Sequence, residues 1–322
     1  MTRIRELKLR WRYNFCKLRI SLIFLLLLFI FFNCKKEDRK SDLYSTELVE
    51  VLGPKEKGLY DSLNVPANLR DEVKKISSFN YFDTGVLGHQ NPNIEYATPF
   101  SEFEKLKKKA TIKEIYQLTF NKNPVVTLYS YIEVADRIPK LTPLFYSRLL
   151  NLKKEIYSQN GCIIGDLPPS QIFYDEYLKN VNEDKQAKDL ILRKLDSISI
   201  YGNNTTNYVL NQALRHRVYP EYFHNRLEEL AFAKQNPYVL LYLTKHFREQ
   251  YKDRLQKSII SYLEKTNDDS YEDFSKNTLI LELMKFKNPD NKKLLEKLLE
   301  NNFILKDDHE VNLLKKGNGI TK

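Results

Sequence analysis

The feature that most constrains the fold is a helical spacing of apolar residues, which begins near residue 67 and continues towards the C-terminus. Val125, Leu128, Tyr129, Ile132 and Ala135 follow one another at intervals of three or four residues, so they line one face of a helix. The hydrophobic fraction of 42% is enough for a core, whereas nine Gly and twelve Pro are too few for a turn-rich β-sandwich. The sequence therefore predicts an all-α fold.

The same spacing of apolar residues predicts where each helix begins and ends. The ranges are 68–77, 102–109, 112–120, 124–137, 143–153, 171–180, 184–200, 206–216, 221–234, 237–265, 271–285 and 289–301. The polar, glycine-containing segment 306–322 is expected to be a flexible tail.

Three Asn-Pro pairs stand where one helical stretch ends and the next begins: Asn123-Pro124, Asn236-Pro237 and Asn288-Pro289. An Asn side chain at the N-cap accepts a hydrogen bond from an otherwise unpaired amide, and Pro suits the first helical position. The first two pairs open seven-residue stretches in which Asn, Pro, Val, Leu and Tyr are identical. Each pair therefore predicts a tight corner between helices.

Helix pairs joined by such corners resemble HEAT-type repeats, and residues 105–152 match best. HEAT units often carry Asp-Pro and a following Arg, where this chain has Asn123 and Thr127. The resemblance implies a solenoid that acts as an interaction module for a protein partner. Because the copies do not recur every 40–47 residues, an irregular helical array is the alternative.

The segment 156–169 interrupts the helical pattern. Its Asn160-Gly161 pair is typical of a hairpin turn, so we expect a short hairpin or an ordered loop. Insertions in helical arrays often lie on the binding face, which makes this segment the predicted functional surface. The alternative is a capping loop that buries Ile163 and Ile164.

The N-terminus has the layout of a secretory signal peptide. Seven Lys or Arg and a single Glu occupy the first nineteen residues, and a mostly apolar run, 20–32, follows. This run is shorter than the roughly 20 residues that a membrane-spanning helix needs. We expect a signal peptide over 1–33, with a buried helix or an uncleaved signal anchor as alternatives.

The end of this run, Phe31-Phe32-Asn33-Cys34, resembles the signal peptide of bacterial lipoproteins, although Asn33 replaces the usual small residue and Phe31 the usual aliphatic one. The resemblance implies that Cys34 is acylated with chains such as palmitate and becomes the first residue of the mature protein. One chain anchors only marginally, so firm attachment needs several. The implied location is the bacterial cell envelope, at the periplasmic or surface face of the outer membrane.

Removal of the leader changes the electrostatic reading. The full chain has 52 basic and 42 acidic residues and a net charge of +10. Without seven bases and one acid of the leader, 45 and 41 remain, a net charge of +4. The expected export leader therefore carries most of the excess positive charge, and we expect no nucleic-acid partner.

No motif for catalysis, metal ligation or cofactor binding occurs in the sequence, which has no Gly-rich phosphate loop, His-Glu-x-x-His or Gly-x-Ser-x-Gly. A convergent hydrolase site of Cys162, Asp166 and a distant His is one alternative. His216 and His224 do not have a zinc-motif spacing. The 21 Tyr and 18 Phe allow a glycan-binding surface as another alternative, and the cluster around Lys105–Lys109 is expected to be a solvated face.

The expected organisation is a signal peptide (1–33), a polar tether (34–66), a helical-repeat-like domain (67–305) and a flexible tail (306–322). The functional hypothesis is a lipid-anchored envelope protein that acts as a non-catalytic interaction or scaffold module. An envelope hydrolase and a glycan- or substrate-capturing lipoprotein are the alternatives.

Overall fold

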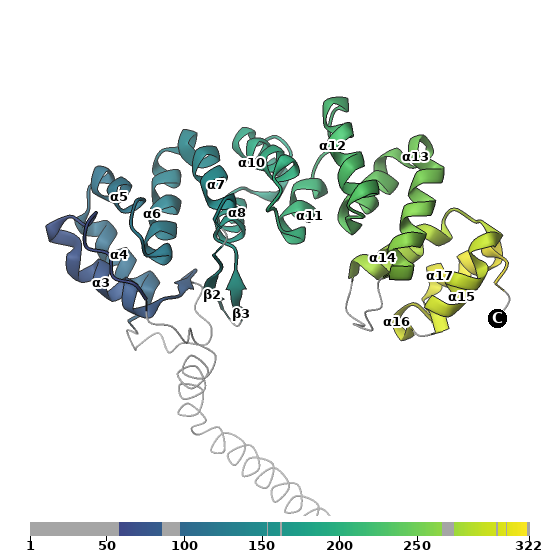
Figure 1. Ribbon diagram of the computed structural model, residues 1–322, viewed down its shortest axis with the longest axis horizontal. Coiled ribbons are helices and arrows are strands. Elements are labelled where there is room, and N and C mark those ends of the chain that lie inside the picture. Colours follow the sequence, from purple (N-terminus) through teal and green to yellow (C-terminus); the bar gives the residue numbers. More distant parts are fainter. Residues whose placement is uncertain are drawn as a thin grey trace, which may run out of the picture. The chain divides into compact units, whose positions relative to one another are not determined.

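The structure is a computed structural model that describes residues 58–85, 97–152, 154–161, 163–265, 274–300, 302–306 and 308–320 (Figure 1). Within these residues the chain is mostly helical and has one small sheet, which confirms the predicted all-α fold and agrees with an irregular helical array, one of its two expected forms. None of the helices described is both long and apolar enough to cross a bilayer. The predicted signal peptide, Cys34 and Cys162 lie outside the described residues.

The α-helices are α3 (Arg70–Phe79), α4 (Pro99–Lys109), α5 (Ile112–Leu118), α6 (Pro124–Arg137), α7 (Thr142–Leu150), α8 (Pro169–Lys179), α9 (Glu183–Gln186), α10 (Leu190–Tyr201), α11 (Asn207–Arg215), α12 (His224–Glu228), α13 (Pro237–Lys265), α14 (Phe274–Met284), α15 (Lys292–Glu300), α16 (Phe303–Lys306) and α17 (His309–Lys315). Short 3₁₀ segments precede several of them, and a π-helical turn over Glu229–Ala233 follows α12. Consecutive helices pack together, for example α3 on α4, α5 on α6, α10 on α11 and α13 on α14.

Two expected helices are interrupted in the structure. The expected helix 237–265 is kinked where Phe247 and Tyr251 depart from helical geometry. The predicted range 184–200 divides into α9 and α10, and Asp189 stands between them. Its Oδ1 accepts a hydrogen bond of 2.7 Å from the amide of Leu192, so Asp189 is the N-cap of α10. An Asp that caps a new helix is difficult to distinguish in sequence from an Asp on an exposed helical face.

The C-terminal segment also differs from expectation. We expected a flexible tail from residue 306, but α17 occupies part of it and Val311 is fully buried. Asp308 caps this helix by accepting a hydrogen bond of 3.1 Å from the amide of Val311. Val311 and the final isoleucine, Ile320, belong to the second core cluster, although the composition of the segment is polar.

The three Asn-Pro corners form as predicted. Asn123 Oδ1 accepts hydrogen bonds from the amides of Val125 and Val126, at 3.0 and 3.1 Å. Asn236 Oδ1 accepts hydrogen bonds from the amides of the second and third residues of its helix, and Asn288 Oδ1 accepts one from the amide of Asp290. In the second and third corners the residue before Asn has a left-handed φ of 51°, which ends the preceding helix.

The two similar stretches use their tyrosines alike. Tyr129 and Tyr242 stand at the same place after the Asn-Pro corner and are both buried. The hydroxyl of Tyr129 donates to the carbonyl of Asp83 at 2.6 Å and accepts from its amide at 2.9 Å. The hydroxyl of Tyr242 accepts from the amide of Tyr219 at 2.7 Å. Each tyrosine therefore ties a neighbouring backbone segment to its helix.

The predicted insertion is a β-hairpin. Strands β2 (Ile156–Asn160) and β3 (Ile163–Leu167) pair antiparallel, and Gly161 has the positive φ of 60° that the tight turn requires. The alternative of a loop that buries Ile163 is wrong, because Ile163 is 74% exposed. A third strand, β1 (Phe82–Asp83), pairs parallel with β2. A strand of two residues is too short to show an alternating pattern, so β1 could not be predicted from the sequence.

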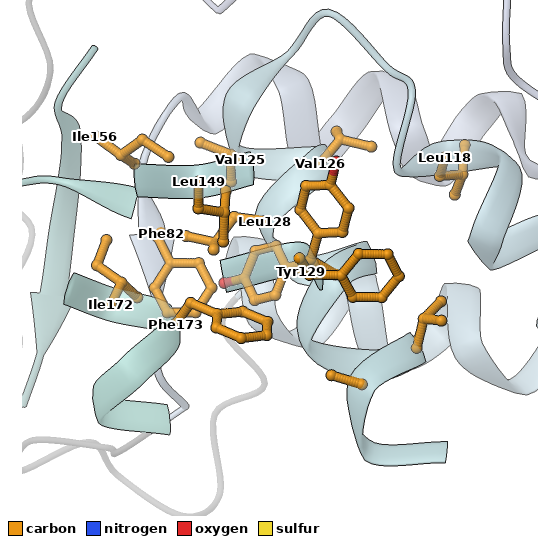
Figure 2. Packing of buried hydrophobic residues seen from close by; sticks show 14 of the residues in the cluster. Phe82, Leu118, Val125, Val126, Leu128, Tyr129, Leu149, Ile156, Ile172 and Phe173 are labelled. Carbon is orange, nitrogen blue, oxygen red and sulfur yellow. The ribbon is translucent and has the colours of Figure 1, made fainter. Parts of the chain in front are cut away.

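The buried apolar side chains form two clusters, one from Val65 to Val209 and the other from Ile200 to Ile320. Figure 2 shows part of the first cluster, in which Tyr129 lies beside Phe82. The ring centroids of Tyr129 and Phe82 are 4.5 Å apart, and those of Tyr129 and Phe103 4.8 Å. Helix α6 therefore lies in the centre of this cluster.

We predict that Asn123→Ala lowers the free energy of unfolding by about 1–3 kcal/mol. The side chain is fully buried, caps two amides and donates to the carbonyl of Leu59 at 3.0 Å, so its removal leaves several buried groups unpaired. The matched control is Asn288→Ala, an exposed cap, which should cost less than about 1 kcal/mol. Urea denaturation followed by circular dichroism measures both, and equal losses would contradict the prediction.

Candidate functional site

A polar pocket lies between the tip of the hairpin and helices α8, α9 and α11. Its volume of about 310 Å³ is in the lower range of small-ligand sites. The lining residues come from four parts of the chain: Asn160, Asp175, Leu178, Lys179, Val181, Glu183, Gln186 and Tyr208. The hairpin predicted as a functional surface therefore contributes Asn160 to this pocket.

Asp175 is the central ionisable group of the pocket wall. Burial raises the pKa of this carboxyl to about 6, although a hydrogen bond with Tyr208 and the charge of Lys179 act in the opposite direction. Burial and the nearby Asp175 also raise the pKa of Tyr208. The Oδ1 atom of Asp175 is shielded from water, and no donor among the described residues reaches it. A shielded carboxyl oxygen without a donor destabilises the folded state. Destabilising groups of this kind are typical of functional sites.

Gln186 provides a second acceptor of the same kind. Its Nε2 donates to the carbonyl of Val181 at 3.3 Å, whereas no donor in the described part of the chain reaches its Oε1. The residue is 5% exposed. Two shielded oxygens without donors, Asp175 Oδ1 and Gln186 Oε1, therefore belong to residues of one pocket wall.

A buried ion pair supports this wall from the core. Arg217 donates through Nη2 to the carbonyl of Gln186 at 2.8 Å and pairs with Asp196 Oδ2 at 3.0 Å. Asp196 also accepts from the hydroxyl of Tyr174 at 2.7 Å. Burial raises the pKa of Asp196 to about 7 in spite of both partners. These contacts fix the position of α9 and hence of Gln186.

The pocket can bind polar groups. Its described lining residues include no cysteine, serine, threonine or histidine, and its polar groups are amides, carboxyls, one ammonium and one phenol. Lys179 is engaged by Glu176 at 2.7 Å. Amide, carboxyl and phenol groups around an open volume are suited to hydrogen bonding with a polar ligand.

A smaller hollow of about 60 Å³ lies beside Asp83 and Tyr129. It has room for about two water molecules. Burial raises the pKa of Asp83, while hydrogen bonds with Gly85 and Thr98 lower it. Lys107 reaches Glu133 at 3.2 Å at the same hollow. We interpret this hollow as the edge of the first core, because Phe82, Phe103 and Tyr129 of that core form part of its lining.

Of the residues proposed for a hydrolase, Asp166 lines neither of the two pockets. Asp166 is exposed on β3, and Cys162 lies outside the described residues. Burial and the charges of Arg215 and Arg217 lower the pKa of His216, and His224 contacts the ring of Phe247 at 4.7 Å. Across the described ranges, no three His, Cys, Asp or Glu side chains are grouped to hold a metal ion.

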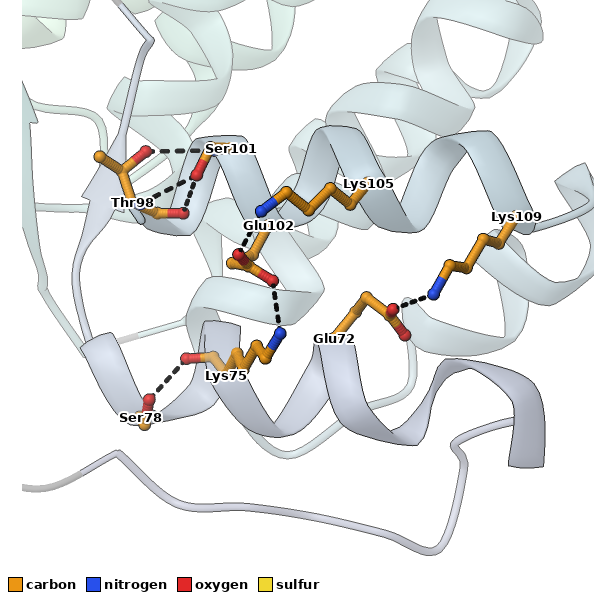
Figure 3. Close-up of polar contacts among 8 residues, drawn as sticks. All are labelled: Glu72, Lys75, Ser78, Thr98, Ser101, Glu102, Lys105 and Lys109. Carbon is orange, nitrogen blue, oxygen red and sulfur yellow. Dashed lines mark hydrogen bonds and ion pairs between the residues drawn. The ribbon is translucent and has the colours of Figure 1, made fainter. Parts of the chain in front are cut away.

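The basic cluster on α4 is paired with carboxylates (Figure 3). Lys105 and Lys75 contact Glu102, at 2.9 and 3.4 Å, and Lys109 pairs with Glu72. Burial would raise the pKa of Glu102, but the hydrogen bonds and charges of these lysines hold it below its usual value. The pairs Lys75–Glu102 and Lys109–Glu72 therefore join α3 to α4, whereas Lys105 pairs within α4.

Sequence reasoning found one of the pocket residues and missed the others. Asn160 was singled out with the hairpin, whereas Asp175, Gln186 and Tyr208 stand in ordinary helical stretches. Comparisons of the chain with protein-family models, with curated proteins and with solved structures find no match.

We predict that Asp175→Asn raises the free energy of unfolding by about 1–3 kcal/mol at pH 8. The folded state holds the Asp175 proton more tightly than the unfolded chain, because the folded pKa is about 6 and the ordinary value is 3.8. Wild-type stability therefore falls as the pH rises from about 4 to about 6, and the Asn variant lacks this loss. Urea denaturation at pH 4, 6 and 8 measures it, and a difference that does not shrink towards pH 4 would contradict it.

Proposed function

We propose that this chain is a lipid-anchored protein of the bacterial cell envelope whose helical body is a non-catalytic binding module. The observation that carries the proposal is the polar pocket, in which amide, carboxyl and phenol groups from four parts of the chain surround one open volume. The sequence that ends at Cys34 and resembles a lipoprotein signal peptide supports the anchor and the envelope location. We expect a protein partner in the envelope and no nucleic-acid partner.

Capture of a glycan or a similar polyhydroxylated ligand is the second candidate. It is favoured by the combination of Tyr208, which is 43% exposed, with Asn160 and Asp175 around one pocket. Amide and carboxyl groups pair with hydroxyls, and an aromatic ring packs on the apolar face of a sugar. The two candidates share the same site and differ in the size of the ligand.

The anchor is tested by metabolic labelling with palmitate in the native host. Wild-type protein should incorporate label and float with membranes, whereas Cys34→Ala should do neither, because the thiol accepts the lipid. Cys162→Ser is the matched control and should be labelled like the wild type. Equal labelling of wild type and Cys34→Ala would refute the anchor.

The binding site is tested by quantitative affinity capture from envelope fractions, and by titration with envelope oligosaccharides. Tyr208→Ala and the double variant Asp175→Ala with Gln186→Ala should lose at least about tenfold in affinity, equivalent to about 1.4 kcal/mol. Tyr222→Ala, which removes an exposed tyrosine elsewhere, is the control and should bind like the wild type. Undiminished binding by the pocket variants would assign the function to another surface.

A further inference from the structure

Five apolar side chains form an exposed patch where the described chain begins. They are Leu59, Tyr60, Leu63, Tyr116 and Phe120, and we call them the entry patch. Leu63 is 78% exposed, Leu59 58% and Phe120 51%. Single exposed leucines are ordinary, but several large apolar side chains on two adjoining segments mark an interaction surface.

The two segments of the entry patch are tied together by hydrogen bonds. Asn64 donates to the carbonyl of Phe120 at 3.3 Å, and Asn123 donates to the carbonyl of Leu59 at 3.0 Å. Between them, Asp61 accepts from the amide of Lys122 at 2.9 Å. These bonds come from three points along residues 59–64, so the apolar side chains are held next to α5 and do not depend on a free chain end.

Close packing also fixes the beginning of this segment. A Cβ on Gly58 would lie 1.7 Å from the carbonyl oxygen of Ser77, so only glycine allows this approach to α3. At the other end, Val65 is part of the first core. The segment that carries Leu59 and Leu63 is therefore anchored at both ends, while its apolar side chains point to solvent.

The surroundings of the patch suit a lipid surface. Tyr116 and Phe120 are one turn apart on α5 and its end, with ring centroids 5.6 Å apart, and Lys113 precedes them on the same face. Lys113 and Lys122 are both exposed. Protein surfaces that bind a membrane interface typically carry aromatic rings at headgroup depth, with leucines beside them and lysines at the rim.

The covalent path from the proposed anchor leads directly to this patch. Gly58 stands 24 positions after Cys34, and Leu59 follows it. Even a fully extended connection of that length spans only about 80 Å, so an acylated Cys34 would keep the patch at a high effective concentration beside the bilayer. Under this condition a surface of weak intrinsic affinity is still occupied.

Resting on the proposed lipid anchor, we propose that the entry patch docks on the bilayer surface and holds the helical body against the membrane. Leu63 and Phe120 enter the interface, and Lys113 and Lys122 contact anionic headgroups. The helical body is then not free to turn about its tether, and the same face of the protein is always turned to the lipid.

The test uses the full lipidated protein with Cys162→Ser, so that an introduced cysteine is the single free thiol. A polarity-sensitive fluorophore is attached at Leu63→Cys, and in a matched control at Leu190→Cys, which replaces another exposed leucine. Both proteins are reconstituted into vesicles of phosphatidylethanolamine and phosphatidylglycerol. We expect a blue shift at position 63 and quenching by brominated lipid, and neither at position 190. Adding Phe120→Glu to the position-63 protein should abolish the shift.

The outcomes separate the patch from the anchor. Protein that floats with the vesicles while the position-63 probe still reports water would overturn docking and leave the anchor intact. Protein that does not float would refute the anchor and the docking that rests on it. An equal blue shift at positions 63 and 190 would also overturn docking by this patch. Phe120 is half exposed, so circular dichroism should show that Phe120→Glu folds like the parent.

Discussion

The buried carboxamide of Asn123 is the contact on which the N-terminal half of the structure depends. Its oxygen satisfies the first amides of α6, the helix at the centre of the first core, and its nitrogen holds the carbonyl of Leu59. A side chain with both a donor and an acceptor is required here, because one group must face a helix start and the other an extended backbone. Aspartate, which is frequent at this position in HEAT-type repeats, could cap the helix but could not donate to Leu59.

Much of the fold could be predicted because it depends on local chemistry. The Asn-Pro corners, the helix over 124–137 and the Asn160-Gly161 hairpin are each determined by a few adjacent residues, and all are present in the structure. The failures have a common physical cause. The division at Asp189, the strand at Phe82 and the burial of Val311 depend on what packs against them, and that information is not contained in a short window of sequence.

The pocket was less predictable than the fold, since its residues are ordinary in isolation. Asp175 and Gln186 differ from other helical Asp and Gln only in being shielded without donors, a property of the assembled structure. Asn160 was found because the turn that contains it has a sequence signature. Arg217 illustrates the same limit, because its role in supporting Gln186 depends on its pairing with Asp196 in the core.

The parallel pairing of β1 with β2 has a consequence for the order in which the chain can fold. Phe82 pairs with Ser158, 76 positions later, and Tyr129 holds the backbone of Asp83 from a helix that lies between them. During synthesis from the N-terminus, helices α3 to α7 emerge before the strand that completes the sheet. Closing so long a loop is entropically costly, so the first core cannot reach its final state until the hairpin has followed.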